Sequence, residues 1–303
     1  MSMWAQILQD SCLSSGWRAR IARRVRRSRL RFGDPEINYK IGAADLTIPM
    51  SHMLPIYRRD YASYLSNFSR IIEELSLKWP QLRVIDIGAN VGDTLALIRE
   101  ANPNAAVLCV EGNPDYLKFL SKNAAKFDSG VFIEQSYLGS GATFAGVISQ
   151  NEGTAHLEER PDAGVLQTIT LEQLIGRHPD FGLPHFIKID TDGFDARILD
   201  ACTNFLGLHG PLVFAEVDPK MTRDAGQDWL ETIQSLVEQG YTDSIWWSNV
   251  GRMVCRFDLT NAGIVADLLH FQPGGHTYSD VLFGRAEHLE FMNAMRDREL
   301  RCA

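Results

Sequence analysis

The chain has 303 residues, 45% of them hydrophobic, which is enough to form a large domain with a sizeable core. Its formal net charge is −8, and no apolar run approaches the roughly 18 residues that a transmembrane helix needs. Five dispersed cysteines without a CxxC pair argue against a disulfide framework or a zinc site. Because residues 1–16 also lack the apolar core of a signal peptide, we expect a cytoplasmic protein.

Positive charge is concentrated near the N-terminus. Eight arginines lie between Arg18 and Arg31, with no acidic residue among them. Removing them from the 30 basic residues leaves 22 against 38 acidic ones, so the rest of the chain carries about −16. Such an acidic body argues against nucleic-acid binding, because phosphate contacts need a basic face.

The arginine-rich segment has a helical pattern. Trp17, Ile21 and Val25 recur every four residues, which predicts a helix over residues 17–31 with a thin apolar stripe in a cationic surround. It either packs on the acidic body of its own chain or docks on an anionic membrane surface or an acidic partner. We interpret residues 1–35 as a basic N-terminal helical extension.

A hairpin and a helix are expected next. Residues 36–50 predict a hairpin that turns near Gly42. An apolar face repeats from Tyr57 to Trp79 and predicts one helix, which Pro80 ends. We interpret residues 36–80 as a cap that lies over the following domain and helps to shape a substrate pocket.

Strands and helices alternate from Leu82 onwards, which predicts a parallel sheet with right-handed crossovers. The first five strands are expected at residues 82–87, 105–110, 131–138, 185–190 and 211–217, and later strands supply an antiparallel edge. A hairpin of residues 144–149 and 154–159 interrupts the alternation. The predicted fold is α/β, with a doubly wound, mostly parallel seven-stranded Rossmann-like sheet over residues 81–286. A C-terminal helix follows at 287–303.

The stretch Val84–Thr94 predicts a strand, a glycine turn and a helix N-terminus, which together form a ligand cradle. A dinucleotide fingerprint would have its third glycine at the position of Asp93. Because a carboxylate there fits poorly against a pyrophosphate, NAD and an oxidoreductase function are disfavoured. The spacing of Asp86, Gly88 and Gly92 instead suits a cationic, phosphate-free nucleoside such as S-adenosylmethionine.

Glu111 ends the second strand, 19 residues after Gly92, where a carboxylate can accept hydrogen bonds from both ribose hydroxyls. The alternative is that Glu111 only caps the helix beginning near Pro114. Room for the adenine is expected beside Gly112, with polar partners at the end of the third strand. The predicted cofactor-binding residues are Asp86, Gly88, Asn90, Gly92, Asp93, Thr94, Glu111, Gly112, Asn113, Gln135 and Ser136.

The segments 84–94 and 110–114 together resemble class I S-adenosylmethionine-dependent methyltransferases. Three later segments, at 153–157, 168–172 and 187–195, are similar in order and spacing to the FkbM family. Asp192 and Asp195 stand where that family often has glutamate, which keeps the charge on a shorter side chain. The resemblance covers residues 82–217, less clearly 36–285. It implies O-methylation of a hydroxyl on a sugar, glycan or natural-product intermediate.

Methyl transfer to a hydroxyl needs an oriented acceptor and a base. The candidate catalytic residues are Asp190 and Asp192, after the fourth strand, and His276, in a glycine-rich loop. In a second mechanism Asp190, Asp192 and Glu216 hold Mg²⁺, which lowers the pKa of the hydroxyl. Asp192 and Asp195 also suit capping of the helix near Phe194.

Lys188 lies on an otherwise apolar strand, so we expect it to pair with an acid such as Glu216. The function hypothesis from a different class is an inactive nucleoside-binding or scaffolding protein on the same fold. The acceptor and the oligomeric state do not follow from the sequence.

Overall fold

The computed structural model describes residue 7 and residues 16–151, 154–159, 165–275 and 277–302. Within these ranges, no helix has both the length and the apolar character that crossing a bilayer requires.

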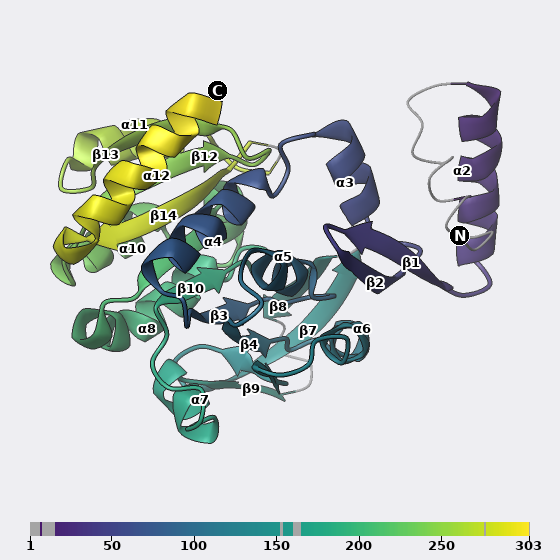
Figure 1. The fold of residues 1–303 in the computed structure, drawn as a ribbon, viewed down its shortest axis with the longest axis horizontal. Helices are drawn as coiled ribbons and strands as arrows, with labels where there is room; N and C mark the ends of the chain where they lie inside the picture. Colours follow the sequence, from purple (N-terminus) through teal and green to yellow (C-terminus); the bar gives the residue numbers. More distant parts are fainter. Residues whose placement is uncertain (1–6, 8–15, 152–153, 160–164, 276, 303) are drawn as a thin grey trace.

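The largest sheet has eight strands in the order β13-β12-β14-β11-β10-β3-β4-β5 (Figure 1). The last five in this order are parallel to one another, and the first three form the antiparallel edge. The bounds are β3 Arg83–Ile87, β4 Ala106–Val110, β5 Val131–Glu134, β10 Phe186–Ile189, β11 Leu212–Val217, β12 Tyr241–Ser248, β13 Met253–Asp258 and β14 Ser279–Arg285. The predicted α/β fold is confirmed. The predicted count of seven strands is wrong, because β13 pairs with β12 and adds an eighth strand.

Helices cover both faces of this sheet, because the central strands alternate their apolar side chains between two cores. Val84 of β3 packs in one core and its neighbour Ile85 in the other. The first core includes residues of α4 Ser66–Lys78, α5 Asp93–Ala101, α6 Pro114–Ala124 and α12 Leu289–Cys302. The second includes residues of α7 Leu171–Arg177, α8 Asp195–His209, α10 Trp229–Glu238 and α11 Ala262–Phe271. The short helices α9 Pro219–Asp224 and η1 Ala286–His288 complete this part of the chain.

The N-terminal region consists of α2 Trp17–Leu30, the hairpin β1 Glu36–Ile41 and β2 Ala44–Pro49, and α3 Leu54–Asp60. The predicted basic helix and hairpin are confirmed. The predicted single helix from Tyr57 to Trp79 is wrong, because the chain breaks between α3 and α4. Leu65 there has φ 62°, and Ser63 Oγ donates to the carbonyl of Val250 at 2.5 Å. A contact with a segment far along the chain therefore sets this break, and local periodicity does not reveal it.

A second sheet has the order β6-β9-β7-β8, with bounds β6 Tyr137–Leu138, β7 Thr143–Asn151, β8 Thr154–Glu159 and β9 Val165–Ile169. The predicted hairpin is confirmed as β7 and β8. The predicted third strand over residues 131–138 is wrong, since β5 ends at Glu134 and β6 joins the second sheet. The Glu134 carboxylate accepts from Ser136 at 2.6 Å and lies 3.0 Å from His178 Nε2, so side-chain contacts hold the chain where it leaves the large sheet.

Candidate active site

The glycine turn after β3 contacts the loop after β10. Gly88 has φ 75°, and a Cβ atom at this position would lie 1.9 Å from the carbonyl oxygen of Asp190. Only glycine allows this approach without displacing backbone. The two most informative sequence motifs, around Gly88 and around Asp190, therefore form parts of one site.

A buried lysine holds these two loops together. Lys188 Nζ lies 3.1 Å from Asp86 Oδ1 and 3.3 Å from Asp190 Oδ2, and it donates to the carbonyl of Gly88 at 3.1 Å. Burial alone would lower the pKa of Lys188, but Asp190, Asp86 and Asp93 raise it further than burial lowers it. The expected pairing with an acid is confirmed, but the partners are Asp86 and Asp190. Strands β3 and β11 both flank β10, but the register places Asp86 directly opposite Lys188 on β3 and Phe214 opposite it on β11, with Glu216 two residues further along.

Asp86 and Thr94 join the strand to the helix that follows the turn. Thr94 Oγ1 donates to Asp86 Oδ2, and both side chains are buried. Asp93 begins α5, where a carboxylate is favoured by the helix dipole. Burial raises the pKa of Asp93 to about 6. These residues lie beneath the cradle and hold its shape.

Glu111 fixes the rim of the cradle. Its Oε2 accepts the N–H of Asn90 at 2.8 Å, and its Oε1 accepts the N–H of Asn113 at 2.7 Å. Burial raises the pKa of Glu111, although the N–H groups of Asn113 and Asn90 oppose this shift. The side chain that caps α6 is that of Asn113, which accepts the N–H of Asp115. The alternative of Glu111 as the helix cap is therefore wrong.

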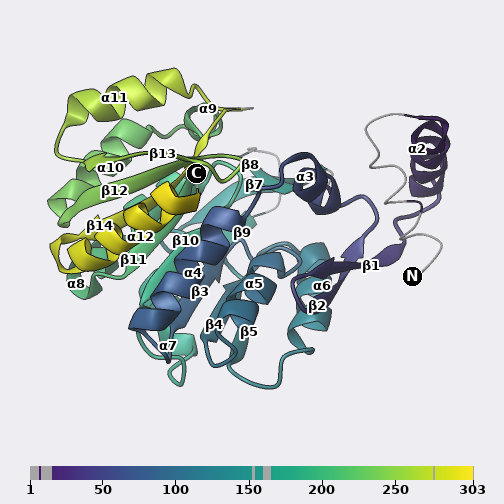
Figure 2. The same cartoon turned by 45° about the horizontal axis from the view of Figure 1, so that its top comes forward.

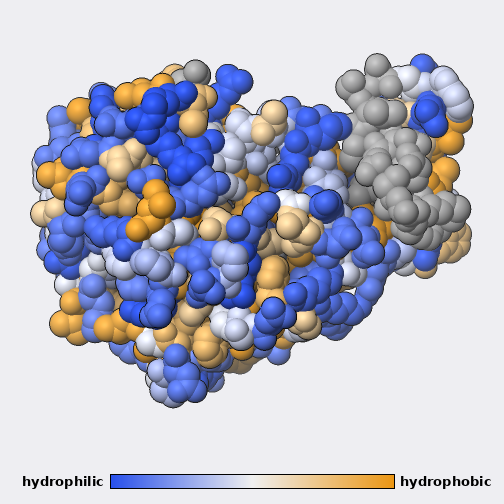
Figure 3. Space-filling model, in the orientation of Figure 1, coloured by the Kyte–Doolittle hydropathy of each residue, from blue (hydrophilic) through white to orange (hydrophobic). Residues whose placement is uncertain are grey.

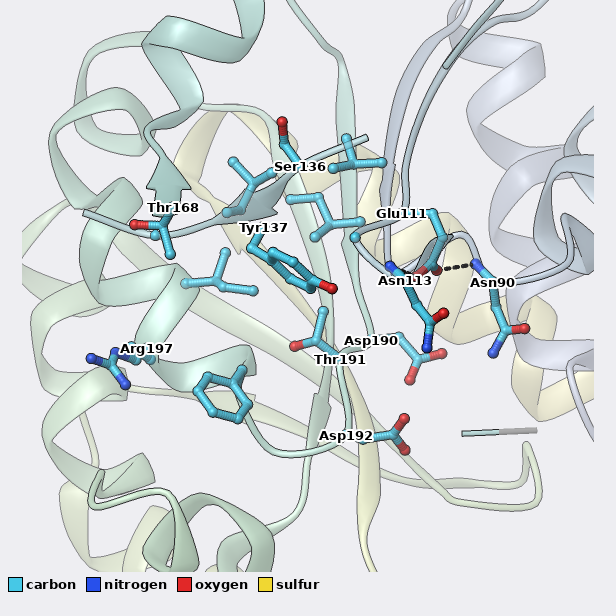
Figure 4. A pocket seen from close by; sticks show the side chains of 18 of the residues that line it. Asn90, Glu111, Asn113, Ser136, Tyr137, Thr168, Asp190, Thr191, Asp192 and Arg197 are labelled. Carbon is cyan, nitrogen blue, oxygen red and sulfur yellow. Dashed lines mark hydrogen bonds between the residues drawn. The ribbon is translucent and has the colours of Figure 1, made fainter. Parts of the chain in front are cut away.

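A cavity opens between these loops and the second sheet, with a volume of about 970 Å³ including the solvent at its mouth (Figure 4). The predicted residues that line it are Gly88, Asn90, Glu111, Gly112, Asn113, Ser136, Asp190 and Asp192. Gln135 does not line this cavity but a neighbouring hollow with Gln167 and Arg177, and the two share Ser136 and Tyr137. His276 lies outside the described residues.

Several lining residues were not predicted from the sequence. Tyr137, Thr168 and Arg197 also line the cavity, with the Tyr137 ring near the middle of Figure 4. The Tyr137 ring lies against the backbone of Gly112, where a Cβ atom would be 2.1 Å from it. Tyr137 directly follows the predicted pair Gln135 and Ser136, so its place in the chain was a usable signal.

The cap also reaches the cradle, through His52. His52 Nδ1 accepts the N–H of Leu54 at 3.2 Å, and Nε2 lies 3.2 Å from Asn90 Oδ1. Burial lowers the pKa of His52 to about 4, so the ring is neutral at pH 7 and its Nε2–H donates to Asn90. The contact fixes the Asn90 amide, and no sequence motif marks it.

Carboxylates gather around the ends of β10, β11 and β14. Burial raises the pKa of Asp280 to about 7, with a further contribution from Asp190. Burial and repulsion by Asp190 likewise raise the pKa of Asp195 to about 7. The pKa of Glu216 is raised by burial and by the charges of Asp190 and Asp195. Negative charge therefore exceeds positive charge at this end of the site.

Two tyrosines lie among these carboxylates. The pKa of Tyr64 is raised by burial and by Asp190, and the pKa of Tyr278 is raised chiefly by Glu216. Tyr64 belongs to the segment between α3 and α4, so the cap contributes to this end as well.

These carboxylates do not converge as metal ligands. Within the described part of the chain, no group of three or more His, Cys, Asp or Glu side chains is arranged to hold a metal ion. Asp190 is turned towards Lys188, and Asp195 Oδ2 accepts from Thr191 Oγ1 at 3.1 Å. Asp195 thus binds the turn before α8. The N-cap residue of this helix is Phe194 and no side-chain hydrogen bond caps it, so the predicted capping role of Asp192 and Asp195 is wrong. The arrangement of Asp190, Asp192 and Glu216 gives the predicted Mg²⁺ site no support.

Comparison with known proteins identifies the family. The model of the methyltransferase FkbM domain matches residues 86–242, just over half of the chain. The chain belongs to the FkbM methyltransferase family. It is thus an S-adenosylmethionine-dependent methyltransferase, as the resemblance implied. A search of curated proteins finds no match.

Three solved structures that are similar to this chain are distant from it in sequence. The FkbM methyltransferase of Methylobacillus flagellatus has 14% identity and a TM-score of 0.38, over 67% of this chain and 44% of that one. Precorrin-6y C5,15-methyltransferase of Geobacter metallireducens has 14% identity and a TM-score of 0.38, over 72% and 87%. The ribosomal protein L11 methylase of Lactobacillus delbrueckii has 12% identity and a TM-score of 0.35, over 72% and 76%.

Proposed function

We propose that this FkbM methyltransferase methylates a hydroxyl group of a sugar, glycan or natural-product intermediate. The observation that carries the proposal is the contact between the Gly88 turn and the Asp190 loop. Because of this contact, the proposed nucleoside cradle and the partly exposed Asp190 carboxylate border the same cavity. S-Adenosylmethionine supplies an electrophilic methyl group when it is bound.

The cradle residues suit this cofactor. The Glu111 carboxylate is oriented by two backbone N–H groups and retains acceptor capacity for ribose hydroxyls. Gly112 and Tyr137 border the place proposed for the adenine. The acidic surround of Asp190 and Asp93 favours a cationic sulfonium and disfavours a phosphate-bearing ligand.

Asp190 is the proposed base. Its side chain is 45% exposed, and its Oδ2 lies 3.3 Å from Lys188 Nζ. Lys188 fixes the orientation of the carboxylate, and Asp190 Oδ1 is left to accept the proton of the acceptor hydroxyl. Asp192, with φ 52° on the same loop, is proposed to position the acceptor.

Calorimetry with S-adenosylhomocysteine tests the cofactor site. The wild type and Asp190→Asn are expected to bind equally, whereas Glu111→Gln is expected to bind at least about tenfold more weakly because a ribose acceptor is lost. Asp224→Asn, at an exposed ion pair with Lys220, is the matched control. Absence of wild-type binding at millimolar ligand would refute the cofactor assignment.

Release of S-adenosylhomocysteine in the presence of a panel of hydroxylated acceptors tests the chemistry. Asp190→Asn is expected to lower kcat by about 10²–10⁴-fold. A wild-type rate in this variant would make Asp190 the wrong base, and His276→Gln in the same assay tests the second candidate. Loss of activity with a chelator, restored by Mg²⁺, would favour the metal mechanism. Cofactor binding by the wild type without transfer to any acceptor would favour the scaffolding alternative.

A further inference from the structure

Helix α2 stands apart from the sheet, beyond the β1–β2 hairpin at one end of the molecule (Figures 1 and 2). Arg26 ties it to the body, since its Nε donates to the carbonyl of Met50 at 3.1 Å and its Nη2 to that of Ser51 at 2.9 Å. Ala19 and Ala22 are the buried residues of the helix.

The large apolar side chains of this helix face outwards. Trp17 is 69% exposed, Ile21 52% and Val25 37%, and Phe32 just beyond the helix is 83% exposed. Because Trp17, Ile21 and Val25 are spaced by four residues, they form one stripe along the helix. Figure 3 shows hydrophobic surface along the outer edge of this part of the molecule. A helix that only packed on its own domain would bury this stripe.

Arginines border the stripe on both sides. Successive helical positions turn by about 100°, which places Arg18 and Arg29 on one side of it. By the same rotation, Arg20, Arg24, Arg27 and Arg31 lie on the other side. All of these arginines except the partly buried Arg29 are exposed. No acidic residue occurs between Gly16 and Gly33 to offset this charge.

We propose that α2 is an interfacial helix that docks this methyltransferase on an anionic phospholipid surface. The Trp17–Ile21–Val25 stripe enters the boundary between headgroups and acyl chains, and the flanking arginines bind lipid phosphates. An aligned apolar stripe favours a bilayer over an acidic protein groove, because arginines on both sides can reach headgroups while the stripe is immersed. This inference is independent of the acceptor and of the catalytic base.

The negative charge of the rest of the chain determines which end of the protein faces the membrane. The rest of the chain carries about −16, so an anionic surface repels it while attracting α2. Contact is therefore confined to the α2 end. Binding is expected to be reversible and to weaken as salt screens the arginines.

Co-sedimentation of the full-length protein with vesicles tests the proposal. The wild type is expected to bind vesicles of phosphatidylcholine with about 30% phosphatidylglycerol and not vesicles of phosphatidylcholine alone. The triple variant Trp17→Ser, Ile21→Ser, Val25→Ser keeps every arginine and is expected to bind at least about tenfold more weakly. Equal binding of the wild type to vesicles with and without phosphatidylglycerol would overturn the proposal.

A matched control removes equally exposed apolar side chains from the body. Leu77 and Leu208 are each 77% exposed and Leu300 is 56% exposed, so the triple serine variant at these positions is expected to bind like the wild type. If the stripe variant bound vesicles as tightly as the wild type, the arginine charge alone would account for binding, and the proposed insertion of the stripe would be wrong. Binding to polyglutamate that is as tight as binding to vesicles, and equal in both variants, would indicate an acidic protein partner instead.

Tryptophan fluorescence reports insertion directly. In a Trp4→Phe background, vesicles are expected to shift the emission to shorter wavelength, and this shift should be lost when Trp17→Phe is added, because Trp229, Trp246 and Trp247 are already buried and Trp79 stacks on His185. Thermal unfolding of each variant confirms that its fold is intact. A shift that persists in Trp17→Phe would contradict insertion of this side chain.

Discussion

The two ends of the site are stabilised differently. At the cradle, polar groups meet fixed partners: Glu111 accepts two backbone N–H groups, and Lys188 holds Asp86. At the ends of β10, β11 and β14, burial raises the pKa of Asp195, Glu216 and Asp280, and the charge of Asp190 raises each of them further. The first end is preorganised, whereas the second keeps like charges close together at a cost in stability.

This difference in stabilisation fits the role that the proposed reaction gives to each end of the site. A cofactor is the same molecule in every turnover, so a rigid backbone cradle can be shaped for it in advance. In the proposed reaction the acceptor has to give up a proton, and carboxylates that resist ionisation are suited to hydrogen-bonding or accepting it. Substitutions at the cradle should therefore change the stability of the fold through backbone fit. At the carboxylate end, the contribution to stability should instead change with pH.

The largest expected effect comes from Gly88→Ala. Its Cβ atom would lie 1.9 Å from the Asp190 carbonyl oxygen at φ 75°, so the turn or the β10 loop must move. We expect the free energy of unfolding to fall by about 3 kcal/mol and S-adenosylhomocysteine affinity to fall at least about 100-fold. Urea unfolding and calorimetry measure the two effects.

Gly226→Ala is the matched control for backbone conformation alone. Gly226 has φ 77°, and no atom lies within 4 Å of its added Cβ position. We expect it to lose only about 1 kcal/mol of stability and no cofactor affinity. If the two variants were equally destabilised, the contact between the two loops would not be what requires glycine at position 88.

A smaller effect is expected at the carboxylate end, from Asp280→Asn. The folded-state pKa of Asp280, about 7, lies well above the ordinary value of an aspartate, so its ionisation destabilises the fold as pH rises towards and through 7. The variant cannot ionise. We expect it to be more stable than the wild type at pH 8, with the advantage smaller by about 2 kcal/mol at pH 5. Thermal and urea unfolding at both pH values measure this difference.

The pH dependence of stability expected from Asp280 is opposite in sign to that expected from the buried histidines. Burial lowers the pKa of His52 and of His288 to about 4, so these rings destabilise the fold as pH falls from 6.5 towards 4. The two variants Asp280→Asn and His52→Gln should therefore respond to pH in opposite directions. A gain in Asp280→Asn that is the same at pH 5 and pH 8 would argue against charge repulsion at this end.

The same contrast explains what could be predicted from the sequence. The cradle is built from one contiguous segment and the strand after it, so the spacing of Gly88, Gly92 and Glu111 was sufficient to predict it. The alternation of strands and helices likewise predicted the parallel sheet and its antiparallel edge. Residue spacing reports structure among neighbours in the sequence, and both the cradle and the strand–helix alternation are set by such neighbours.

The carboxylate end could not be predicted as a unit. Tyr64, Glu216 and the pair Tyr278 and Asp280 come from three separate segments, and their proximity depends on the order of β10, β11 and β14 in the sheet. The break between α3 and α4 that places Tyr64 there depends on Ser63 reaching Val250. The pairing of Lys188 with Asp86 depends on strand neighbours in the same way. The domain boundaries and the roles of the site residues stay predictions.

The smallest expected effect concerns Tyr137, which lies between the two ends. Its hydroxyl is buried and has no hydrogen-bond partner among the described residues, and it points into the cavity (Figure 4). An unpartnered buried hydroxyl costs free energy that a ligand can recover by bonding to it. Tyr137→Phe is therefore expected to leave stability unchanged or slightly higher while weakening S-adenosylhomocysteine binding about threefold to tenfold.

Tyr241→Phe also removes a buried tyrosine hydroxyl, but the opposite effects on stability and cofactor affinity are expected. The Tyr241 hydroxyl is buried as well, but it donates to the carbonyl of Pro211 at 2.6 Å, away from the cavity. Its loss is expected to lower stability by about 1 kcal/mol and to leave cofactor affinity unchanged. If Tyr137→Phe lost stability and kept affinity in the same way, its hydroxyl would belong to the packing of the second sheet. A loss of affinity without a loss of stability would place Tyr137 with the cradle.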